Sequence, residues 1–286
     1  MRPRKLAAEW LLSGPSVAWL AIFFVAPTIM VFAMAFRPAD PYGGLGDGWS
    51  LEAMGALFRR THQIALWRTL WISAVSTVAC LIMALPVAYW IARLPRRTGG
   101  WVLAVIIVPF WTNFLIRIYA WKTVLHVDGP LKQALVAVGL VDPGTNLLFN
   151  PAAVIVVLVY NYLPFAILPL YAAAERFDFG LLEAARDLGA GRWRALASVF
   201  VPGISRGVLT AFLVTFIPML GSYAIPDIVG GASAEMIGNK IAQRVFADRN
   251  LPLASALASV LALLVLLPGL ALMCAPRLRR GAGEGS

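Results

Sequence analysis

Residues that hold metal ions or form disulfide bridges are scarce in this sequence. Its 286 residues include two cysteines and two histidines. Cys80 and Cys274 lie in separate apolar stretches, where lone thiols usually serve as small packing residues. His62 and His126 have no second histidine or cysteine at ligand spacing. The sequence therefore predicts neither a disulfide bridge nor a metal site.

The sequence also lacks the motifs of ATP binding and of most catalytic sites. It has no GxxxxGKS/T loop, and none of its four lysines follows a glycine-rich turn (Lys5, Lys122, Lys132 and Lys240). Paired carboxylates, metal clusters and nucleophile–base pairs at catalytic spacing are absent as well. We therefore expect no cofactor in this chain and no enzymatic activity of its own.

Charged residues are few, at 13% of the chain, while 60% of residues are hydrophobic and the mean hydropathy is +0.78. This composition is too apolar for a soluble core and indicates a polytopic membrane protein. Six apolar runs are long enough to span a bilayer, at residues 11–36, 69–92, 101–121, 152–174, 207–225 and 254–275. The predicted fold is all-α, with six transmembrane helices in a membrane domain at 11–275.

Arg117 is the one charged residue within the six runs. Ion-coupled transporters normally need ionisable groups inside the bilayer, so the scarcity of such groups disfavours that class. The run at 11–36 is too long for the apolar core of a secretory signal, which favours a retained span.

The net charge of +10 is carried by short basic clusters at the ends of the runs. They lie at the N-terminus, after the second run, in the 175–206 segment and in the tail (Arg2, Arg4, Lys5; Arg93, Arg96, Arg97; Arg176, Arg186, Arg192, Arg194, Arg206; Arg277, Arg279, Arg280). By the positive-inside rule, the N-terminus (1–10), the tail (276–286) and the 175–206 segment are cytoplasmic. No nucleic-acid-binding module accompanies the clusters, so we expect no nucleic-acid partner.

The 175–206 segment has the pattern of two short helices joined at a glycine. Apolar residues at helical spacing predict one face of the first helix (Phe177, Leu181, Ala184, Ala185 and Leu188), opposite Glu183, Arg186 and Asp187. Gly189 stands where a helix C-terminus often needs positive φ, and Pro202 suits the first turn of a following helix. The alternative is an amphipathic hairpin lying on the membrane surface.

The spacing within this segment resembles the loop by which permease subunits of ABC importers engage a separate ATPase. That pattern is Glu-Ala-Ala, three residues, Gly, nine residues and Ile-x-Leu-Pro. It is matched here by Glu183, Ala184, Ala185, Gly189, Val199, Val201 and Pro202, with valine in place of the isoleucine and the leucine. Further stretches are similar to the first permease of spermidine/putrescine importers, at 109–119, 163–165, 181–190, 225–231 and 236–238. The sequence departs from that family at Arg249-Asn250-Leu251-Pro252, where Arg-Asp-Trp-Pro is frequent, and at Ser222.

The resemblance implies the fold of a type I ABC importer permease in a bacterial inner membrane, in contact with membrane lipid. It implies a heterodimer with a second permease, two ATPase subunits that bind ATP and Mg²⁺, and a periplasmic substrate-binding protein. The residues it assigns to ATPase coupling are Glu183, Ala184, Ala185, Asp187, Gly189 and Pro202. Transport would proceed by alternating access. Alternatives are a permease for an opine, another cationic compound, thiamine or ferric iron, or an ion-coupled secondary transporter.

A polyamine pathway needs aromatic faces and oxygen acceptors, because both bind cations. Trp111, Asn113 and Asp227 are our candidates for this pathway, although aromatic residues near span ends also serve as interfacial anchors. Each predicted span contains proline, and we favour a hinge at Pro218. In the outward segment 227–253, apolar residues at helical spacing predict a short interfacial or re-entrant helix (Ile237, Ile241 and Val245).

Overall fold

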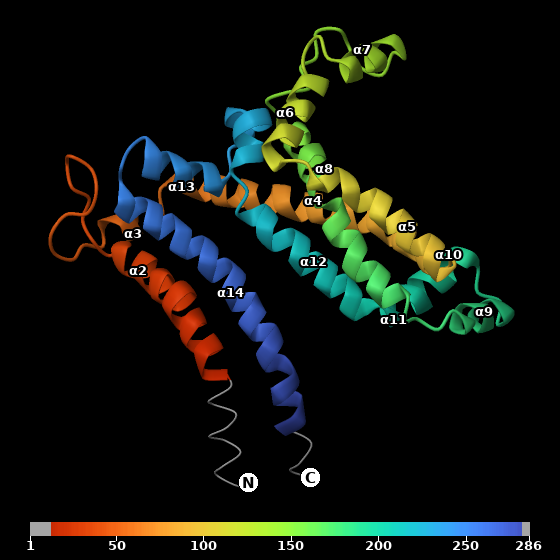
Figure 1. Ribbon diagram of the computed structural model, residues 1–286. Helices are drawn as coiled ribbons and strands as arrows, with labels where there is room; N and C mark the ends of the chain where they lie inside the picture. Colours follow the sequence, from red (N-terminus) through yellow and green to blue (C-terminus); the bar gives the residue numbers. More distant parts are fainter. Residues whose placement is uncertain (1–12, 282–286) are drawn as a thin grey trace. The chain divides into compact units, whose positions relative to one another are not determined.

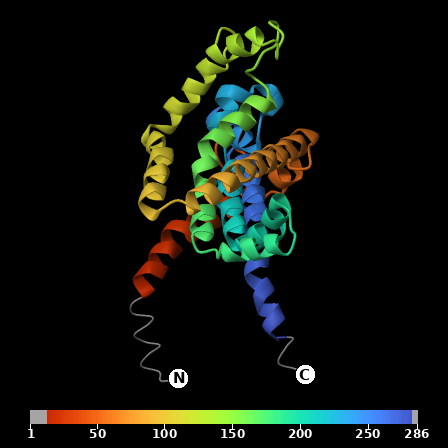
Figure 2. The same ribbon diagram turned by 90° about the vertical axis from the view of Figure 1, so that its right-hand side faces the viewer.

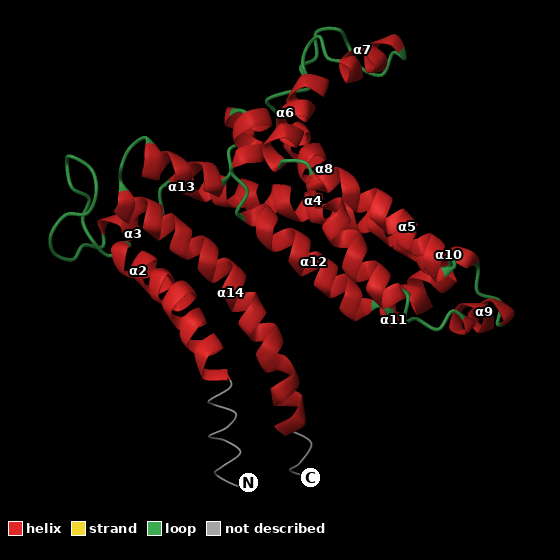
Figure 3. Ribbon diagram, in the orientation of Figure 1, coloured by secondary structure: helices red, strands yellow, loops and turns green. Residues whose placement is uncertain are grey.

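The computed structural model describes the backbone of residues 13–281 and the side chains of residues 13–266. Within this range the elements are helices joined by turns and loops, with one isolated β-bridge between Ala39 and Leu45 and no strand (Figure 3). The predicted all-α class is confirmed. The predicted N-terminal segment 1–10, the end of the tail at 282–286 and the side chain of Cys274 lie outside the described residues.

The chain divides into two compact units, residues 1–64 with 240–286 and residues 65–239. In the first unit, α2 (Ala26–Met34) continues the π-helical turn η1 (Ala21–Val25) and packs against α14 (Leu251–Gly281). The short helix α3 (Glu52–Ala56) also contacts α14. Buried Ala35, Ala53 and Ala256 form the centre of this packing, because alanine lets helices approach closely.

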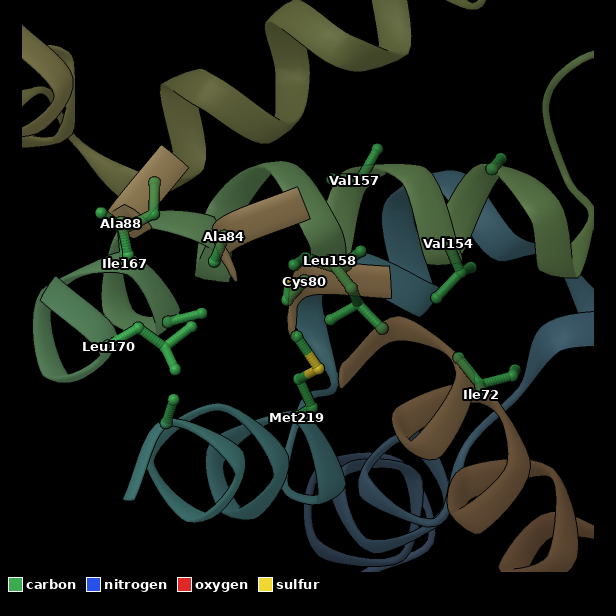
Figure 4. Packing of buried hydrophobic residues seen from close by; sticks show 14 of the residues in the cluster. Ile72, Cys80, Ala84, Ala88, Val154, Val157, Leu158, Ile167, Leu170 and Met219 are labelled. Carbon is green, nitrogen blue, oxygen red and sulfur yellow. The ribbon is translucent and has the colours of Figure 1, made fainter. Parts of the chain in front are cut away.

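The second unit is built on the long helix α4 (Arg60–Ala92), most of which it contains, and on α8 (Pro151–Ala174) and α12 (Ser205–Leu220). Helices α8 and α12 run side by side in two perpendicular views (Figures 1 and 2). Buried side chains from all three helices meet in one core, among them Cys80 of α4, Leu158 of α8 and Met219 of α12 (Figure 4). Cys80 is a free thiol in this core, as expected of a packing residue.

The contact between α8 and α12 depends on a glycine. A Cβ atom added to Gly207 would lie 2.3 Å from the Cβ of Ala173 and 3.1 Å from the carbonyl oxygen of Pro169. Atoms cannot approach so closely, so only glycine fits at this point of α12. Thr77 adds a polar link across the core, because its hydroxyl donates to the sulfur of Met219 at 3.4 Å.

The remaining elements connect these helices. Between α4 and α8 lie α5 (Arg96–Ile107), the 3₁₀ turn η2 (Val108–Trp111), α6 (Phe114–Val124) and α7 (Pro130–Ala137). Between α8 and α12 lie α9 (Gly180–Asp187), α10 (Arg192–Ala195), η3 (Leu196–Phe200) and α11 (Val201–Gly203). After α12 come η4 (Pro226–Gly230), η5 (Ala232–Ala234) and α13 (Ile237–Phe246), which confirms the helix predicted within 227–253.

The six predicted spans map onto helices, but two of them are not continuous. Ser13–Met34, Arg60–Ala92 and Pro151–Ala174 are long and apolar enough to cross a membrane, and Leu251–Leu266 is a shorter apolar helix. The run at 101–121 is bent by 87° between Trp111 and Phe114. Pro109 lies in the 3₁₀ turn, and the Asn113 side chain caps α6, so a new helix starts at Phe114. The third predicted span is therefore built of two helices.

The run at 207–225 also differs from expectation. Its helix α12 is joined to 192–203 through a 75° bend at Ile204, and it ends at Leu220, two residues after Pro218. The bend therefore lies at the other end of α12 from the expected hinge. Residues 221–225 lead instead into the π-helical turn η4.

Candidate functional site

The 175–206 segment forms the predicted pair of short helices at one end of the second unit (Figure 1). Helix α9 ends in a Schellman motif, in which the Gly189 N–H donates to the Arg186 carbonyl at 2.9 Å and the Ala190 N–H to the Ala185 carbonyl at 3.0 Å. Gly189 adopts a φ of +88°, a conformation that side chains disfavour. The predicted role of this glycine as the helix stop is confirmed.

The second half of the segment is helical from Arg192 to Gly203, with a π-helical turn in the middle. Pro202 lies in α11, near the end of this helical run. The chain then bends at Ile204, whose N–H donates to the Phe200 carbonyl at 3.0 Å, and enters α12. The segment is therefore joined directly to one of the core helices.

The predicted single apolar face of α9 is divided in the structure. Leu182 is 5% exposed, and Phe177 and Ala185 pack against the core. Leu181 and Leu188 are 52% and 89% exposed, and Ala184 is exposed between them. Because successive helical residues are rotated by about 100°, Leu182 faces the bundle while Leu181, Ala184 and Leu188 share another face. We call these three residues the exposed apolar face of α9.

Four aromatic rings hold the segment against α4. The Phe200 ring lies 5.2 Å from Tyr89, 5.1 Å from Phe177 and 6.2 Å from Phe179, measured between centroids. The edge-to-face pairs Tyr89–Phe200 and Phe177–Phe200 are favourable aromatic geometries. Gly203 makes room for the cluster, because a Cβ there would lie 2.4 Å from a carbon of the Phe177 ring. The sequence analysis named Phe177 but did not identify Tyr89 or Phe179 as part of the site. The closeness of Phe177 and Phe179 in the sequence was the one feature that could have indicated an aromatic cluster.

Glu183 and Asp187 are exposed on α9, together with the basic residue Arg186. Glu183 lines a pocket whose other charged residues are Arg93, Arg186 and Arg192. The segment thus presents an apolar surface of small and aliphatic side chains next to charged groups. That arrangement suits docking against another protein, where an apolar centre is surrounded by a polar rim.

The three pathway candidates come from two places in the second unit. Trp111 is 82% exposed in η2, and Asn113 follows it at the bend, where its side-chain oxygen accepts from the Leu115 N–H at 2.8 Å. Asp227 is exposed in η4, and α6 packs against η4. The elements that carry Asn113 and Asp227 are therefore neighbours, and the Asn113 side chain has a structural role as a helix cap.

Arg117 of α6 is packed among aromatic rings. Its guanidinium carbon lies 4.6 Å from the centroid of Phe110 and 5.9 Å from that of Phe114. Such cation–π contacts stabilise a charge that has left bulk water. No group of three or more histidine, cysteine, aspartate or glutamate residues able to hold a metal ion occurs among the described residues.

Residues 84–280 match the family described as "Binding-protein-dependent transport system inner membrane component". The chain belongs to this family. It is an inner-membrane permease component of a transport system, and the matched region contains α9, Gly189 and the bend into α12. The resemblance derived from the 175–206 segment is thereby confirmed at the level of the family.

Two relatives extend the match to most of the permease. The spermidine/putrescine transport system permease protein PotB of Escherichia coli (strain K12) is 35% identical over 240 residues, which cover 84% of this chain and 87% of that protein. The protein of the same name from Haemophilus influenzae is 34% identical over 250 residues, covering 87% of each.

A solved structure supports the fold. A bacterial ABC transporter involved in the import of the acidic polysaccharide alginate contains a chain that superimposes with a TM-score of 0.72 at 19% identity, covering 97% of this permease and 98% of that chain. The fold is that of a type I ABC importer permease.

Proposed function

We propose that this permease is the pathway-forming subunit of an ATP-driven importer of polyamines, of the spermidine or putrescine type. The observation that carries the proposal is the 34–35% identity to spermidine/putrescine permeases over more than four fifths of the chain. A match of this extent covers the core helices as well as the 175–206 segment. It supports a common substrate class as well as a common fold.

Energy for transport would enter through α9. Its exposed apolar face would dock into a groove of an ATPase subunit, and the small side chain of Ala184 would let the groove approach the backbone. Glu183 and Asp187 would pair with groups at the groove's rim, while Ala185 packs inward. Gly189 fixes the turn and Pro202 the start of the connection to α12. ATP and Mg²⁺ would be bound by the ATPase and not by this chain.

The remaining partners follow from the same assignment. The permease would pair with a second, distinct permease, the two would recruit two ATPase subunits, and a periplasmic protein would deliver the solute. Both chain ends, at 1–10 and 276–286, would be cytoplasmic together with the 175–206 segment. In this proposal the chain consists of a membrane domain at 11–275 and two short cytoplasmic ends, at 1–10 and 276–286.

For the solute pathway we propose Trp111 and Asp227, with Asn113 fixing the bend between η2 and α6. The exposed indole of Trp111 offers a face to an ammonium group, and the exposed carboxylate of Asp227 offers a counter-charge. Asp227 sits in a π-helical turn, and such turns are frequent at functional sites. The bundle would expose this pathway to each side in turn.

Uptake of labelled putrescine into right-side-out membrane vesicles loaded with ATP tests the transport class. We expect uptake that needs ATP and the ATPase subunit and survives an ionophore that collapses the proton gradient. Uptake that an ionophore abolishes and that persists without the ATPase would replace the proposal by an ion-coupled transporter. ATP-dependent uptake of an opine, thiamine or ferric iron, with no uptake of polyamine, would support an ATP-driven importer and contradict the polyamine substrate.

A further inference from the structure

A pocket of about 300 Å³ lies between α9, α10 and the end of α4. Three arginines line it, Arg93, Arg186 and Arg192, together with Glu183 and Tyr89. Among the described residues, no carboxylate oxygen lies within 4.0 Å of any of these three guanidinium groups. The pocket therefore gathers three positive charges against one negative charge without an internal ion pair. We call it the arginine pocket.

One of the three guanidinium groups is held in place before any ligand arrives. Arg93 donates from Nη1 to the Tyr89 hydroxyl oxygen at 3.0 Å, and its guanidinium carbon lies 5.3 Å from the Tyr89 ring and 5.4 Å from the Phe179 ring. Tyr89 is itself fixed by the Phe200 ring. Since Tyr89 accepts this bond, its hydroxyl hydrogen can be donated to an anion in the pocket.

The arginine pocket is separate from the exposed apolar face of α9. At about 100° per residue, Leu182 and Arg186 point away from Leu181, Ala184 and Leu188, and Glu183 lies at the edge between the two faces. An ATPase seated on the exposed apolar face would therefore leave the pocket between α9 and the membrane helices.

The pocket lies where a membrane span ends. Helix α4 ends at Ala92, and Arg93 is the next residue. Trp90, one turn earlier on the span, is 56% exposed, and exposed tryptophans near span ends mark the level of the lipid headgroups. We therefore expect Arg93 at the level of the headgroup phosphates.

We propose that the arginine pocket binds the phosphate group of an anionic membrane lipid. Arginine binds phosphate through paired, charge-assisted hydrogen bonds, and basic pockets between membrane helices accommodate anionic headgroups. Arg93 supplies a fixed donor, Arg186 and Arg192 close around the phosphate from α9 and α10, and Glu183 excludes a more highly charged anion. A bound lipid would brace α9 against α4. This inference needs only a membrane-embedded chain and is independent of the polyamine assignment.

Lipid counting on the intact protein tests the proposal. The protein is purified from membranes with its native subunits, placed in nanodiscs of phosphatidylcholine with graded phosphatidylglycerol, and analysed by native mass spectrometry. We expect retention of phosphatidylglycerol by the wild type and roughly tenfold weaker retention in Arg192→Gln, because one charge-assisted bond is lost. Arg93→Gln should behave in the same way, and the two variants together guard against a folding defect in either one.

Arg194→Gln is the matched control. Arg194 is exposed on the same helix as Arg192 but does not line the pocket. Retention unchanged in Arg194→Gln and lowered in the two pocket variants supports the site. Equal loss in all three variants would mean diffuse attraction to the membrane and would overturn it. Displacement of the lipid by millimolar inorganic phosphate would show that the pocket binds a soluble anion, and it would contradict the proposal that a lipid supplies the phosphate.

Discussion

At the scale of single residues, the 175–206 segment and the core helix that follows it depend on glycines for different reasons. Gly189 is needed for its backbone conformation, since its φ is +88° and an added Cβ would meet no atom within 4 Å. Gly207 is needed for space, since α8 passes against it. The first requirement was predictable from the sequence, because a glycine after an amphipathic stretch indicates a helix stop. The second was not, because Ala173 and Gly207 are brought together only by folding.

Replacement of Gly189 by valine should distort the end of α9 while leaving the membrane helices intact. A β-branched residue in this conformation costs on the order of 1–3 kcal/mol, which the short segment avoids by changing its turn. We expect normal abundance in the membrane and reduced co-purification of the ATPase.

Gly191→Ala is the control for Gly189→Val. Gly191 has a φ of −64°, and an added Cβ meets no atom within 4 Å, so alanine fits there. Full ATPase association in Gly189→Val, measured beside this control, would contradict the role of the turn.

Gly207→Ala should destabilise the whole second unit. The new methyl group overlaps Ala173, and such overpacking costs about 1–3 kcal/mol. Thermal unfolding of the purified protein should show a lowered midpoint, partly restored in the double variant Gly207→Ala with Ala173→Gly. Gly100→Ala, at a position in α5 with no atom within 4 Å of the added Cβ, should leave the midpoint unchanged. A midpoint that Gly207→Ala does not change would refute the close contact.

At the scale of elements, α9 illustrates what an amphipathic pattern can and cannot predict. The spacing predicted which residues share a helix face, but not whether the chain itself covers that face. The structure buries Leu182 and leaves Leu181, Ala184 and Leu188 exposed. The same limit explains the broken third span, because an apolar run is equally compatible with one helix or with two helices that meet at Asn113. The arginine pocket joins residues about a hundred positions apart, which no local pattern reveals.

Leu188→Glu tests the exposed apolar face of α9. Leu188 is 89% exposed, so a charge there meets water in the free permease and should not change its unfolding midpoint. In a docked complex the carboxylate would be desolvated against an apolar groove, which costs several kcal/mol. We expect loss of ATPase association in a pull-down from membranes.

Leu140→Glu is the control for Leu188→Glu, since Leu140 is 71% exposed and lies outside the 175–206 segment. An equal loss of ATPase association in both variants would show that the effect of the added charge is not specific to the exposed apolar face of α9.

At the scale of the whole molecule, the chain is an inner-membrane permease in which the 175–206 segment continues directly into a core helix. The bend at Ile204 joins the 175–206 segment to α12, and α12 packs along α8 through Gly207. A displacement of α9 would therefore be transmitted to the paired helices α8 and α12. Nothing in this path requires an ionisable group within the bilayer, which agrees with an external source of energy.

ATP hydrolysis by a complex reconstituted from this permease and the proposed second permease, ATPase and binding protein tests whether the chain serves a polyamine importer. We expect hydrolysis that rises when spermidine or putrescine is added together with the binding protein, and that loses this rise in Gly189→Val. A rate of hydrolysis that polyamine does not change would contradict the polyamine substrate. An ATPase that does not associate with the permease at all would contradict the ATP-driven importer.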